Sequence, residues 1–245
     1  MQRKKDMVTD KGEQTRSRIL EIALDMFCER GYDETTMRAI AEHAGVALGN
    51  TYYYFRSKDQ LIQAFYERIH QETFVACRPV LDKERTLDAR LRGVMRSMLG
   101  IIEPYHHLSG LLFKTAADPH SPLNPFSSES EAVREQSITL FKEVVRGSKD
   151  RVPADLQTEL PTLLWLYHMG IVLFWIHDAS PRHARTNRLV DQTVKLVVKL
   201  ISLASLPLMG PLRKSVMRLL TEMRDNAWTS EDPSVLGHND AKGRS

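Results

Sequence analysis

The chain has 245 residues, of which 42% are hydrophobic and 27% charged, and its formal net charge is +3. One large domain or two modest domains fit this length, and the apolar content is sufficient for a sizeable core. The cysteines are Cys28 and Cys77 alone, so reduced, buried thiols of a cytosolic protein are expected rather than a disulfide scaffold or a zinc site. Eleven Lys/Arg balance eleven Asp/Glu in residues 1–70, so charge alone does not indicate a nucleic-acid partner.

Helix-forming residues dominate the chain, and no alternating pattern typical of strands persists beyond a few residues. The first helix is predicted over residues 14–30 and is expected to end at Gly31. The 10–12 residues before it lack the apolar core of a signal peptide. Their composition fits a disordered tail, and it fits equally a basic arm that contacts the minor groove or the phosphates of DNA.

Two short helices joined by a glycine turn are predicted over residues 36–44 and 48–55. Gly45 stands where a helix that ends in the left-handed conformation needs a residue without a side chain. Thr35 or Thr36 is expected to cap the first of these helices, and Ser57 the helix that begins near Lys58. A short polar helix rich in tyrosine after such a turn is typical of a helix-turn-helix, whose second helix lies in the major groove of DNA.

Residues 35–58 resemble the DNA-binding domain of TetR-type transcriptional regulators, whose pattern is roughly T-x-x-x-I-A-x-x-A-G-V-S-x-G-x-Φ-Y-x-Y-F-x-x-K, where Φ is apolar. The matching residues are Thr36, Ile40, Ala41, Ala44, Gly45, Val46, Gly49, Tyr52, Tyr54, Phe55 and Lys58. Ala47 stands where serine is common, and Thr51 where a larger apolar residue is usual. We expect Thr51 to loosen the packing or alter the pitch of the second helix. The strong match covers residues 15–70, and the rest of the chain resembles the family in layout.

The second helix carries residue types that suit groove recognition. Tyr52 and Tyr54 are expected on one face, where a ring packs on sugar or a thymine methyl, whereas Tyr53 is expected in the core. Asn50 suits an adenine edge or a phosphate, and helix starts such as those at Thr36 and Lys58 favour phosphate. The matching positions contact DNA in TetR-type proteins, which implies these DNA-binding residues: Thr36, Arg38, Leu48, Gly49, Asn50, Tyr52, Tyr54 and Lys58. For each of them, a packing or surface role is the alternative.

Further helices follow, separated by short breaks. Their predicted ranges are 58–78 with a stop near Pro79, 87–103, 105–117, 131–146, 153–177, 182–206 and 211–228. Residues 118–130 are rich in proline and serine and are predicted to form a loop. The chain is therefore predicted to be all-α. A tail and DNA-binding domain are expected over residues 1–57, a larger helical ligand-binding and dimerisation domain over 58–228, and a disordered tail over 229–245.

The helix predicted over residues 182–206 carries two apolar stripes. One stripe is Leu189, Leu196, Leu200 and Leu203, and the other is Val190, Val194, Val197 and Ile201. Two stripes need two partners, namely the chain's own core and a second subunit in a four-helix interface. A buried hairpin within a monomer is the alternative. The resemblance favours a homodimer through helices 153–177 and 182–206, because two reading helices about 34–36 Å apart engage successive grooves of a palindromic operator.

The resemblance also implies that a small-molecule effector enters a pocket among the central helices and tilts the helix that begins at Lys58. Aromatic and methionine side chains suit an apolar or flat ligand, and His106, His168 or Tyr167 is expected to supply a polar contact to it. The candidate lining residues are Phe65, Phe74, Met95, Met98, Ile102, Tyr105, Phe113, Trp165, Tyr167, His168 and Phe174. Packing in an ordinary core is the alternative for each.

Other functional classes find little support in the sequence. No phosphate-binding glycine loop and no G-x-S-x-G, H-E-x-x-H or C-x-x-C motif is present, so neither an enzyme nor a cofactor is expected. The histidines lack metal-ligand spacing, and the apolar run over residues 160–176 is shorter than the roughly 20 residues of a bilayer span. The sequence predicts a cytoplasmic, sequence-specific repressor released from its operator by a small apolar or aromatic ligand. The alternative is a DNA-anchored helical adaptor that acts through a protein partner.

Overall fold

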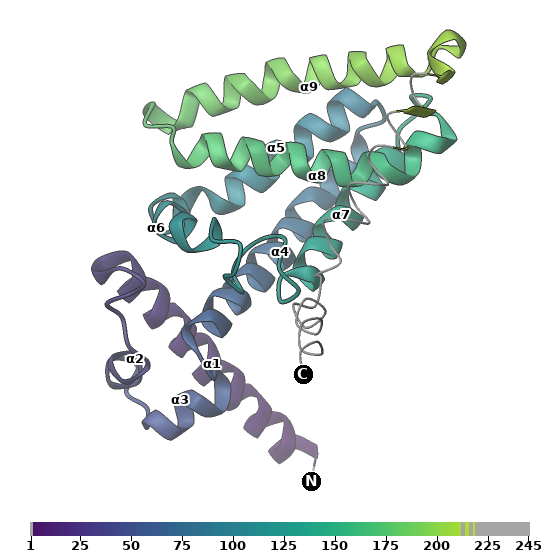
Figure 1. Ribbon diagram of the computed structural model, residues 1–245. Coiled ribbons are helices and arrows are strands. Elements are labelled where there is room, and N and C mark those ends of the chain that lie inside the picture. Colours follow the sequence, from purple (N-terminus) through teal and green to yellow (C-terminus); the bar gives the residue numbers. More distant parts are fainter. Residues whose placement is uncertain (1, 212–213, 216–217, 219–245) are drawn as a thin grey trace, which may run out of the picture.

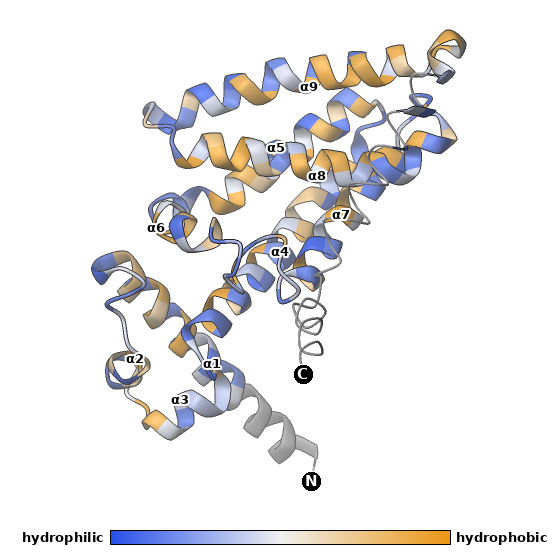
Figure 2. Ribbon diagram, in the orientation of Figure 1, coloured by the Kyte–Doolittle hydropathy of each residue, from blue (hydrophilic) through white to orange (hydrophobic). Residues whose placement is uncertain are grey.

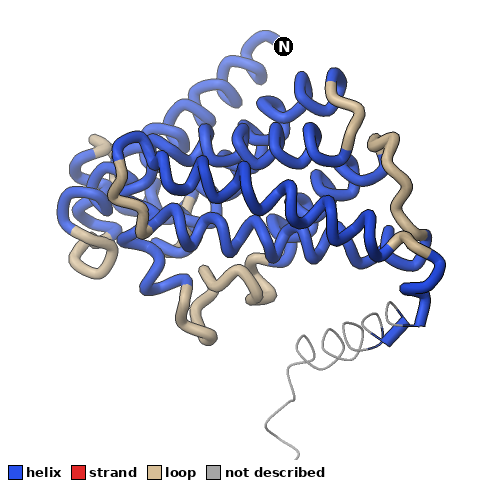
Figure 3. Tube along the Cα trace, turned by 90° about the horizontal axis from the view of Figure 1, so that it is seen from above, coloured by secondary structure: helices blue, strands red, loops and turns tan. Residues whose placement is uncertain are grey.

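The computed structural model of the chain describes residues 2–211, 214–215 and 218. Every regular element in this part of the chain is a helix, as predicted (Figures 1 and 3). The α-helices are α1 Gln2–Arg30, α2 Met37–His43, α3 Leu48–Tyr54, α4 Lys58–Lys83, α5 Leu87–Ile102, α6 His106–Ala116, α7 Glu131–Arg146, α8 Ala154–Ile176 and α9 Ala184–Ala204. Short 3₁₀ turns lie at Glu103–Tyr105 (η1), Pro181–His183 (η2) and Pro207–Met209 (η3). The helix predicted over 211–228 and the tail predicted over 229–245 lie largely or wholly outside the described residues.

Two groups of helices are joined by the long helix α4. Helices α1–α3 form a head at one end of the molecule, and α4 runs from this head into a larger bundle (Figure 1). There α4 packs against α5 and α7, and α8 and α9 lie side by side on the outer side of the bundle. The bundle is therefore connected to the head through α4, and it also contacts the head where α6 packs on α1.

Side-chain caps and a left-handed glycine define the turns of the head. The Thr36 hydroxyl accepts the backbone N–H of Ala39 at 3.2 Å, and the Ser57 hydroxyl accepts that of Gln60 at 3.3 Å. These bonds confirm the predicted caps of α2 and α4, which satisfy helix N–H groups that have no partner within the helix. Gly45 has a φ of +64°, which confirms that the turn between α2 and α3 uses the left-handed conformation that glycine adopts without strain.

The buried apolar side chains form two clusters. The larger one fills the bundle from Cys77 on α4 to Ile201 on α9. The smaller one fills the head and continues into α6 and the following loop, because Leu108, Leu112 and Leu123 belong to it. The core of the head is therefore shared with α6.

Arg90 ties together the ends of three helices. It is 3% exposed, and its guanidinium donates to the carbonyls of Leu81 at 2.6 Å, Glu84 at 2.9 Å, Glu143 at 2.7 Å and Val144 at 2.9 Å. A buried arginine is stable where its N–H groups are hydrogen-bonded in this way. The last turn of α4 and the end of α7 are thus fastened to α5.

The predicted stop of α4 near Pro79 is wrong, since the helix continues to Lys83. Proline removes one backbone N–H, and within a helix that group would bond the carbonyl four residues earlier, at Val75. Val75 is 72% exposed, so the proline lies next to a solvent-facing part of the helix. The turn after Pro79 is then held by the buried Leu81 and by the bond from Arg90 to its carbonyl.

The predicted start of α1 near Gln14 is also too late, because α1 begins at Gln2. The residues expected to form a tail contain no proline. Charged residues such as Lys and Arg have good helix propensity, which favours a longer helix here.

Candidate nucleic-acid interface and ligand cavity

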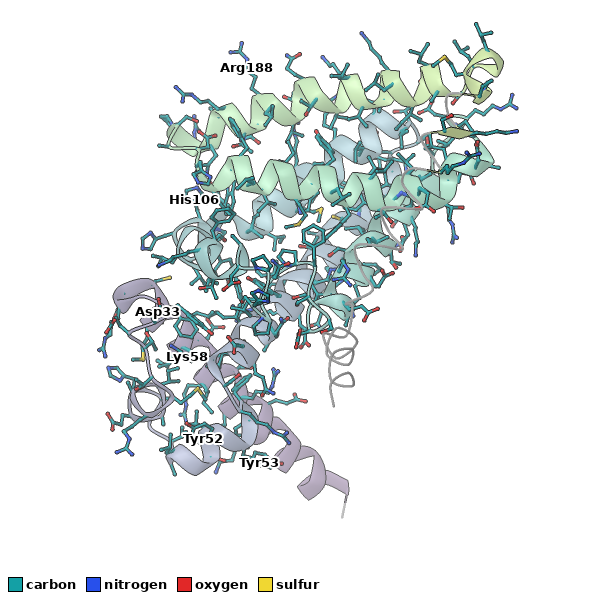
Figure 4. The ribbon with its side chains drawn as sticks, in the orientation of Figure 1. Asp33, Tyr52, Tyr53, Lys58, His106 and Arg188 are labelled. Atoms are coloured by element: carbon teal, nitrogen blue, oxygen red, sulfur yellow. The ribbon has the colours of Figure 1, made fainter. Side chains whose placement is uncertain are left out.

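The orientation of α3 is set by Thr51. Its side chain is completely buried, and its hydroxyl donates to the carbonyl of Ala47 at 3.5 Å. Successive residues of a helix are turned by about 100°, so Tyr53 lies on the side opposite Thr51. Tyr53 is 80% exposed and Tyr52 46% exposed, and both project from the outer side of the head (Figure 4). The prediction that Tyr53 is a core residue is therefore wrong, because Thr51 fills that role.

The predicted contact residues of α3 separate into two groups. Gly49, Asn50 and Tyr52 are exposed, whereas Leu48 and Tyr54 are partly buried against the apolar cluster of the head. The ring of Tyr54 meets Tyr53 edge to face at 5.1 Å between centroids. Its hydroxyl lies close to α1, since a Cβ at Gly12 would stand 3.6 Å from it. The outward surface of α3 is thus made by Gly49, Asn50, Tyr52 and Tyr53.

Two predicted contact residues lie at the start of α2, the helix that packs against α3. Thr36 and Arg38 are both exposed, and the Thr36 hydroxyl is already used as the helix cap. Among the residues that the structure describes, the Arg38 side chain makes no hydrogen bond or ion pair. Arg38 therefore presents a cation to solvent.

Lys58 lies in a different environment from the other predicted DNA contacts. Its ammonium donates to the backbone carbonyls of Tyr32 at 2.5 Å and Asp33 at 3.2 Å. It also lies 4.5 Å from the centre of the Tyr32 ring. Figure 4 shows Lys58 beside Asp33, away from Tyr52 and Tyr53. In this structure the side chain holds the start of α4 to the segment between α1 and α2.

Arg68 links the head to the turn between α5 and α6. Its guanidinium forms an ion pair with Glu21 of α1 and lies 3.3 Å from the hydroxyl of Tyr105. The ring of Tyr105 packs edge to face on Phe65 at 4.8 Å between centroids. These contacts join α1, α4 and η1 at one point next to the bundle.

A cavity of about 610 Å³ lies between α4, α5, α6, α7, α8 and the loop over residues 118–130. This volume is within the range of about 300–1,000 Å³ that is usual for small-molecule sites. Six of the predicted lining residues are in its wall: Phe65, Met98, Ile102, Phe113, Trp165 and His168. Their role in ligand binding remains a prediction.

The loop over residues 118–130 forms one wall of the cavity. Leu123, Asn124, Pro125 and Phe126 line it, and the Phe126 ring meets Trp165 edge to face at 5.5 Å. The loop is held in place by the amide of Gln63, which donates to the Pro122 carbonyl at 2.8 Å. Arg134 of α7 donates to the carbonyls of Pro125 at 2.9 Å and Ser127 at 3.0 Å. The sequence predicted the loop but not this wall, because a loop has no periodicity from which its facing residues can be inferred.

His168 is the buried polar residue that α8 contributes to the cavity wall. It is 8% exposed, and burial lowers its pKa to about 4. Its Nδ1 is enclosed by protein atoms and has no hydrogen-bond partner within the part of the chain that the structure describes. The other two polar candidates lie elsewhere: the Tyr167 hydroxyl is 2.5 Å from Thr193 Oγ1, and His106 Nε2 is 2.9 Å from the Trp175 carbonyl oxygen.

Five predicted lining residues are not part of the cavity. Phe74 and Phe174 are 37% and 42% exposed on the surface, and the guanidinium of Arg78 lies 4.5 Å from the centre of the Phe74 ring. Met95 is completely buried in the core of the bundle. Tyr105 packs against Phe65 and Arg68, and Tyr167 faces α9. A helical pattern shows which residues are apolar, but not which buried side chains border a void.

The two stripes predicted on α9 have different surroundings. Val190, Val194 and Ile201 are buried in the bundle. The other stripe is exposed by 49–55% at Leu196, Leu200 and Leu203, and Phe174 of α8 is 42% exposed. Leu166 and Leu173 of α8 are also exposed, but they line the cavity. Figure 2 shows apolar positions along both helices. One stripe thus packs in the chain's own core, and the other forms an apolar surface on α8 and α9.

Helix α8 is long and apolar enough to cross a membrane by length and composition, and it is the one such helix in the described part of the chain. It nevertheless packs against α6, α7 and α9. Several of its side chains, including Leu160, Leu164, Trp165 and Trp175, are buried. Its apolar composition is therefore accounted for by the core, the cavity wall and the apolar surface of α8 and α9.

Comparison with known proteins places this architecture in a family. Residues 19–65 match the family model of bacterial regulatory proteins of the tetR family. Residues 90–217, which are 128 of the 245 residues, match the model of the tetracyclin repressor-like C-terminal domain.

Relatives agree with this assignment. The chain is 30% identical over 112 residues to the HTH-type transcriptional repressor KstR2 of Mycobacterium tuberculosis H37Rv, a match that covers 46% of this chain and 56% of KstR2. It is 29% identical over 144 residues to KstR2 of Mycolicibacterium smegmatis, covering 58% of this chain and 70% of the relative. The match to the first of these spans only a little more than half of the relative's length.

Solved structures share the fold. A putative TetR-family regulator from Syntrophomonas wolfei has a TM-score of 0.63 at 17% identity, covering 80% of this chain and 98% of that chain. FadR from Bacillus subtilis, solved in complex with stearoyl-CoA, has a TM-score of 0.57 at 16% identity, covering 73% and 96%. With both parts of the chain matched by family models, the protein belongs to the tetR family of DNA-binding bacterial regulatory proteins.

Proposed function

We propose that the protein is a cytoplasmic, homodimeric repressor that binds a palindromic operator through α2 and α3 and is released by an apolar ligand in the cavity. The observation that carries this proposal is the exposed surface of α3. Asn50, Tyr52 and Tyr53 project from a helix whose opposite side is fixed by the buried Thr51. A rigid short helix with polar and aromatic side chains on its free side suits the major groove.

The proposed DNA contacts come from both helices of the motif. Asn50 is suited to an adenine edge, and the two exposed tyrosines to sugar, thymine methyl and phosphate. Arg38 supplies a cation for a phosphate or a base edge. We include Tyr53 among the contacts because it is the most exposed of the three tyrosines of α3, and we assign Leu48 and Tyr54 to positioning the helix.

The apolar surface of α8 and α9 supports dimerisation. Leu196, Leu200 and Leu203 of α9 and Phe174 of α8 are each at least 40% exposed in the single chain. Exposed apolar side chains on two adjacent helices suit a four-helix contact about a two-fold axis. Two heads held in this way would engage half-sites about 34–36 Å apart.

The cavity supports control by a ligand. Its wall includes residues of α4, which leads to the head, and of α6, which packs on α1. A ligand lowers operator affinity if it binds more tightly to a conformation in which the spacing of the two heads does not match the grooves of the operator. A tenfold preference for that conformation corresponds to about 1.4 kcal/mol. Repression then follows if the bound dimer blocks access to a promoter.

The proposal is tested by fluorescence anisotropy at controlled salt, with the DNA upstream of the protein's own gene and scrambled DNA as competitor. We expect nanomolar affinity that survives the competitor and depends on a palindrome. Tyr52→Ala combined with Tyr53→Ala should abolish this binding and leave the helical circular dichroism and the dimer unchanged. Equal, weak binding to both DNAs by the unaltered protein would refute the regulator proposal.

The alternative function is a DNA-anchored adaptor that uses the apolar surface of α8 and α9 to bind another protein. Light scattering after gel filtration distinguishes the two, because an adaptor is expected to be monomeric when pure. Leu200→Glu should convert a dimer to monomers, whereas Gln136→Glu, an exposed change of the same charge on α7, should not. A pure monomer that still binds the operator would favour the adaptor.

A further inference from the structure

We propose that the cavity selects an uncharged, mainly apolar ligand with one carbonyl or similar acceptor oxygen, and that Nε2–H of His168 donates to this oxygen. This inference rests on the proposed function in one respect, namely that the cavity is the effector site. It specifies the chemistry of the ligand and the atom that recognises it.

The cavity wall is apolar along most of its surface. Its aliphatic and aromatic side chains come from α4, α5, α6, α7, α8 and the loop over 118–130, and include Phe65, Ile69, Leu112, Phe113, Val133 and Val172. Such a wall binds hydrocarbon surface through the hydrophobic effect and discriminates weakly between hydrocarbons of similar size. Selection within this class must therefore come from the few polar atoms that reach the void.

The two ring nitrogens of His168 differ in their surroundings. Among the described residues, Nδ1 is fully enclosed and has no hydrogen-bond partner. Nε2 is not among these enclosed atoms, and because His168 lines the cavity we assign Nε2 to the side that faces it. A neutral imidazole carries one proton, and a buried N–H without an acceptor is rarer than a buried acceptor without a donor. The proton therefore belongs on Nε2, where it points a donor at the ligand.

The charge state of the wall argues for an uncharged ligand. Burial lowers the pKa of His168 to about 4 and also lowers the pKa of His70, another wall residue, so both imidazoles are neutral near pH 7. The cation of the wall is Arg134, whose Nη1 donates to the loop carbonyls of Pro125 and Ser127. A carboxylate placed beside His168 would lose its hydration without gaining a cation there. A neutral oxygen loses much less hydration and gains the donor.

The test uses three matched fluorescent probes, titrated into the full-length protein without DNA. They are 6-propionyl-2-(dimethylamino)naphthalene, its 6-propyl analogue, in which CH₂ replaces the carbonyl, and the corresponding 6-carboxylate. We expect the ketone to bind on the order of tenfold more tightly than the propyl analogue, the worth of one hydrogen bond to an otherwise unpaired buried group. The carboxylate should bind more weakly than the ketone.

Two variants of His168 separate the contribution of its N–H donor to ligand affinity from the contribution of its packing. His168→Leu removes the donor and should bring the ratio of ketone to propyl affinity to about one, whereas His168→Gln keeps an N–H near the position of Nε2 and should retain the preference. Ala116→Phe, which places a ring at the cavity wall, should weaken binding of all three probes. Unchanged affinity in Ala116→Phe, or a ketone preference that persists in His168→Leu, would overturn the proposal.

A spectroscopic readout needs no variant. A hydrogen bond lowers the carbonyl stretching frequency of the bound ketone below its value in hexane. A hexane-like frequency in the unaltered protein, or tightest binding by the carboxylate, would refute the assignment. Because no DNA is present, these results are independent of operator binding. If the ketone is preferred but leaves operator affinity unchanged, the ligand chemistry stands and the effector role fails.

Discussion

The ammonium of Lys58 lies over the ring of Tyr32, 4.5 Å from its centre, and donates to the Tyr32 backbone carbonyl at 2.5 Å. The Tyr32 hydroxyl in turn donates to the carboxylate of Asp59. Burial, together with this bond, raises the pKa of Tyr32, so the phenol remains a donor throughout the physiological range. The first turn of α4 and the segment that follows α1 are thus fastened to each other from both sides, and the head turns with α4.

Lys58→Ala should therefore act on stability more than on DNA electrostatics. It removes two hydrogen bonds to carbonyls and a cation–π contact, and we expect a loss of about 1–3 kcal/mol in the free energy of unfolding by urea. The slope of log affinity against log salt for the operator should stay unchanged. Arg38→Ala should do the reverse, with unaltered stability and a salt slope reduced by about one. A reduced slope in Lys58→Ala would instead assign the ammonium to a phosphate.

Neighbouring tyrosines of α3 should respond in opposite ways to truncation. Tyr53→Ala removes an 80% exposed ring and should change stability by less than about 0.5 kcal/mol, while weakening operator binding. Tyr54→Ala removes a ring packed in the head and should destabilise the protein by about 1–3 kcal/mol. Urea unfolding measures the stability of both variants, and fluorescence anisotropy measures their affinity for the operator. A destabilised Tyr53→Ala would show that its ring is packed.

Gly147 should not tolerate a side chain. A Cβ at this position would stand 2.1 Å from Nη2 of Arg90, and that guanidinium cannot move aside without giving up its bonds to the ends of α4 and α7. We expect Gly147→Ala to destabilise the protein by about 1–3 kcal/mol. Gly100→Ala is the matched control, because nothing lies within 4 Å of its Cβ. Alanine there should gain up to about 1 kcal/mol in helix propensity. Equal effects of the two changes on urea unfolding would contradict the role given to Arg90.

Stability should fall in mild acid because of His168. Its pKa is about 4 in the folded chain and about 6.5 when unfolded, so between these values the unfolded chain binds the additional proton. The contribution of the neutral imidazole is complete above pH 6.5 and is lost as the pH falls towards 4. For this group alone we expect a loss of about 2 kcal/mol between pH 7.5 and pH 5.

His168→Gln, which does not titrate, should show a correspondingly smaller loss in urea unfolding over the same pH range. His107→Gln, an exposed change, serves as the control and should follow the unaltered protein. Parallel pH profiles for His168→Gln and the unaltered protein would mean that His168 is protonated as easily in the folded state as in the unfolded state.

Much of the fold follows from the sequence, because periodicity and caps are local signals. The helices of the bundle, the loop over 118–130 and the caps at Thr36 and Ser57 were all predictable. Pro79 and the N-terminal residues were not. Whether a proline ends a helix depends on the exposure of the carbonyl that it leaves unbonded, and that exposure is a tertiary property.

The site was predictable in composition and less so in orientation. One buried threonine, Thr51, turned α3 so that Tyr53 rather than Tyr54 is outermost, which the motif alone does not reveal. His168 was one of three polar candidates for the cavity, and its selection depends on which face of α8 meets the void. Figure 4 shows that the basic residue Arg188 points outward from α9, far from the head.

The clamp made by Arg90 has a mechanical consequence for α4. The helix has 26 residues, which at 1.5 Å per residue is about 39 Å of rigid rod. Its far end is pinned to Arg90 of α5 by two hydrogen bonds, to the carbonyls of Leu81 and Glu84, whereas its near end carries the whole head. A swing of only about 5° about that pivot would displace the head by about 3 Å over a rod of this length. That is as large as the separation between hydrogen-bonded atoms, so a rotation of α4 by a few degrees would separate α3 from any partner to which it is hydrogen-bonded.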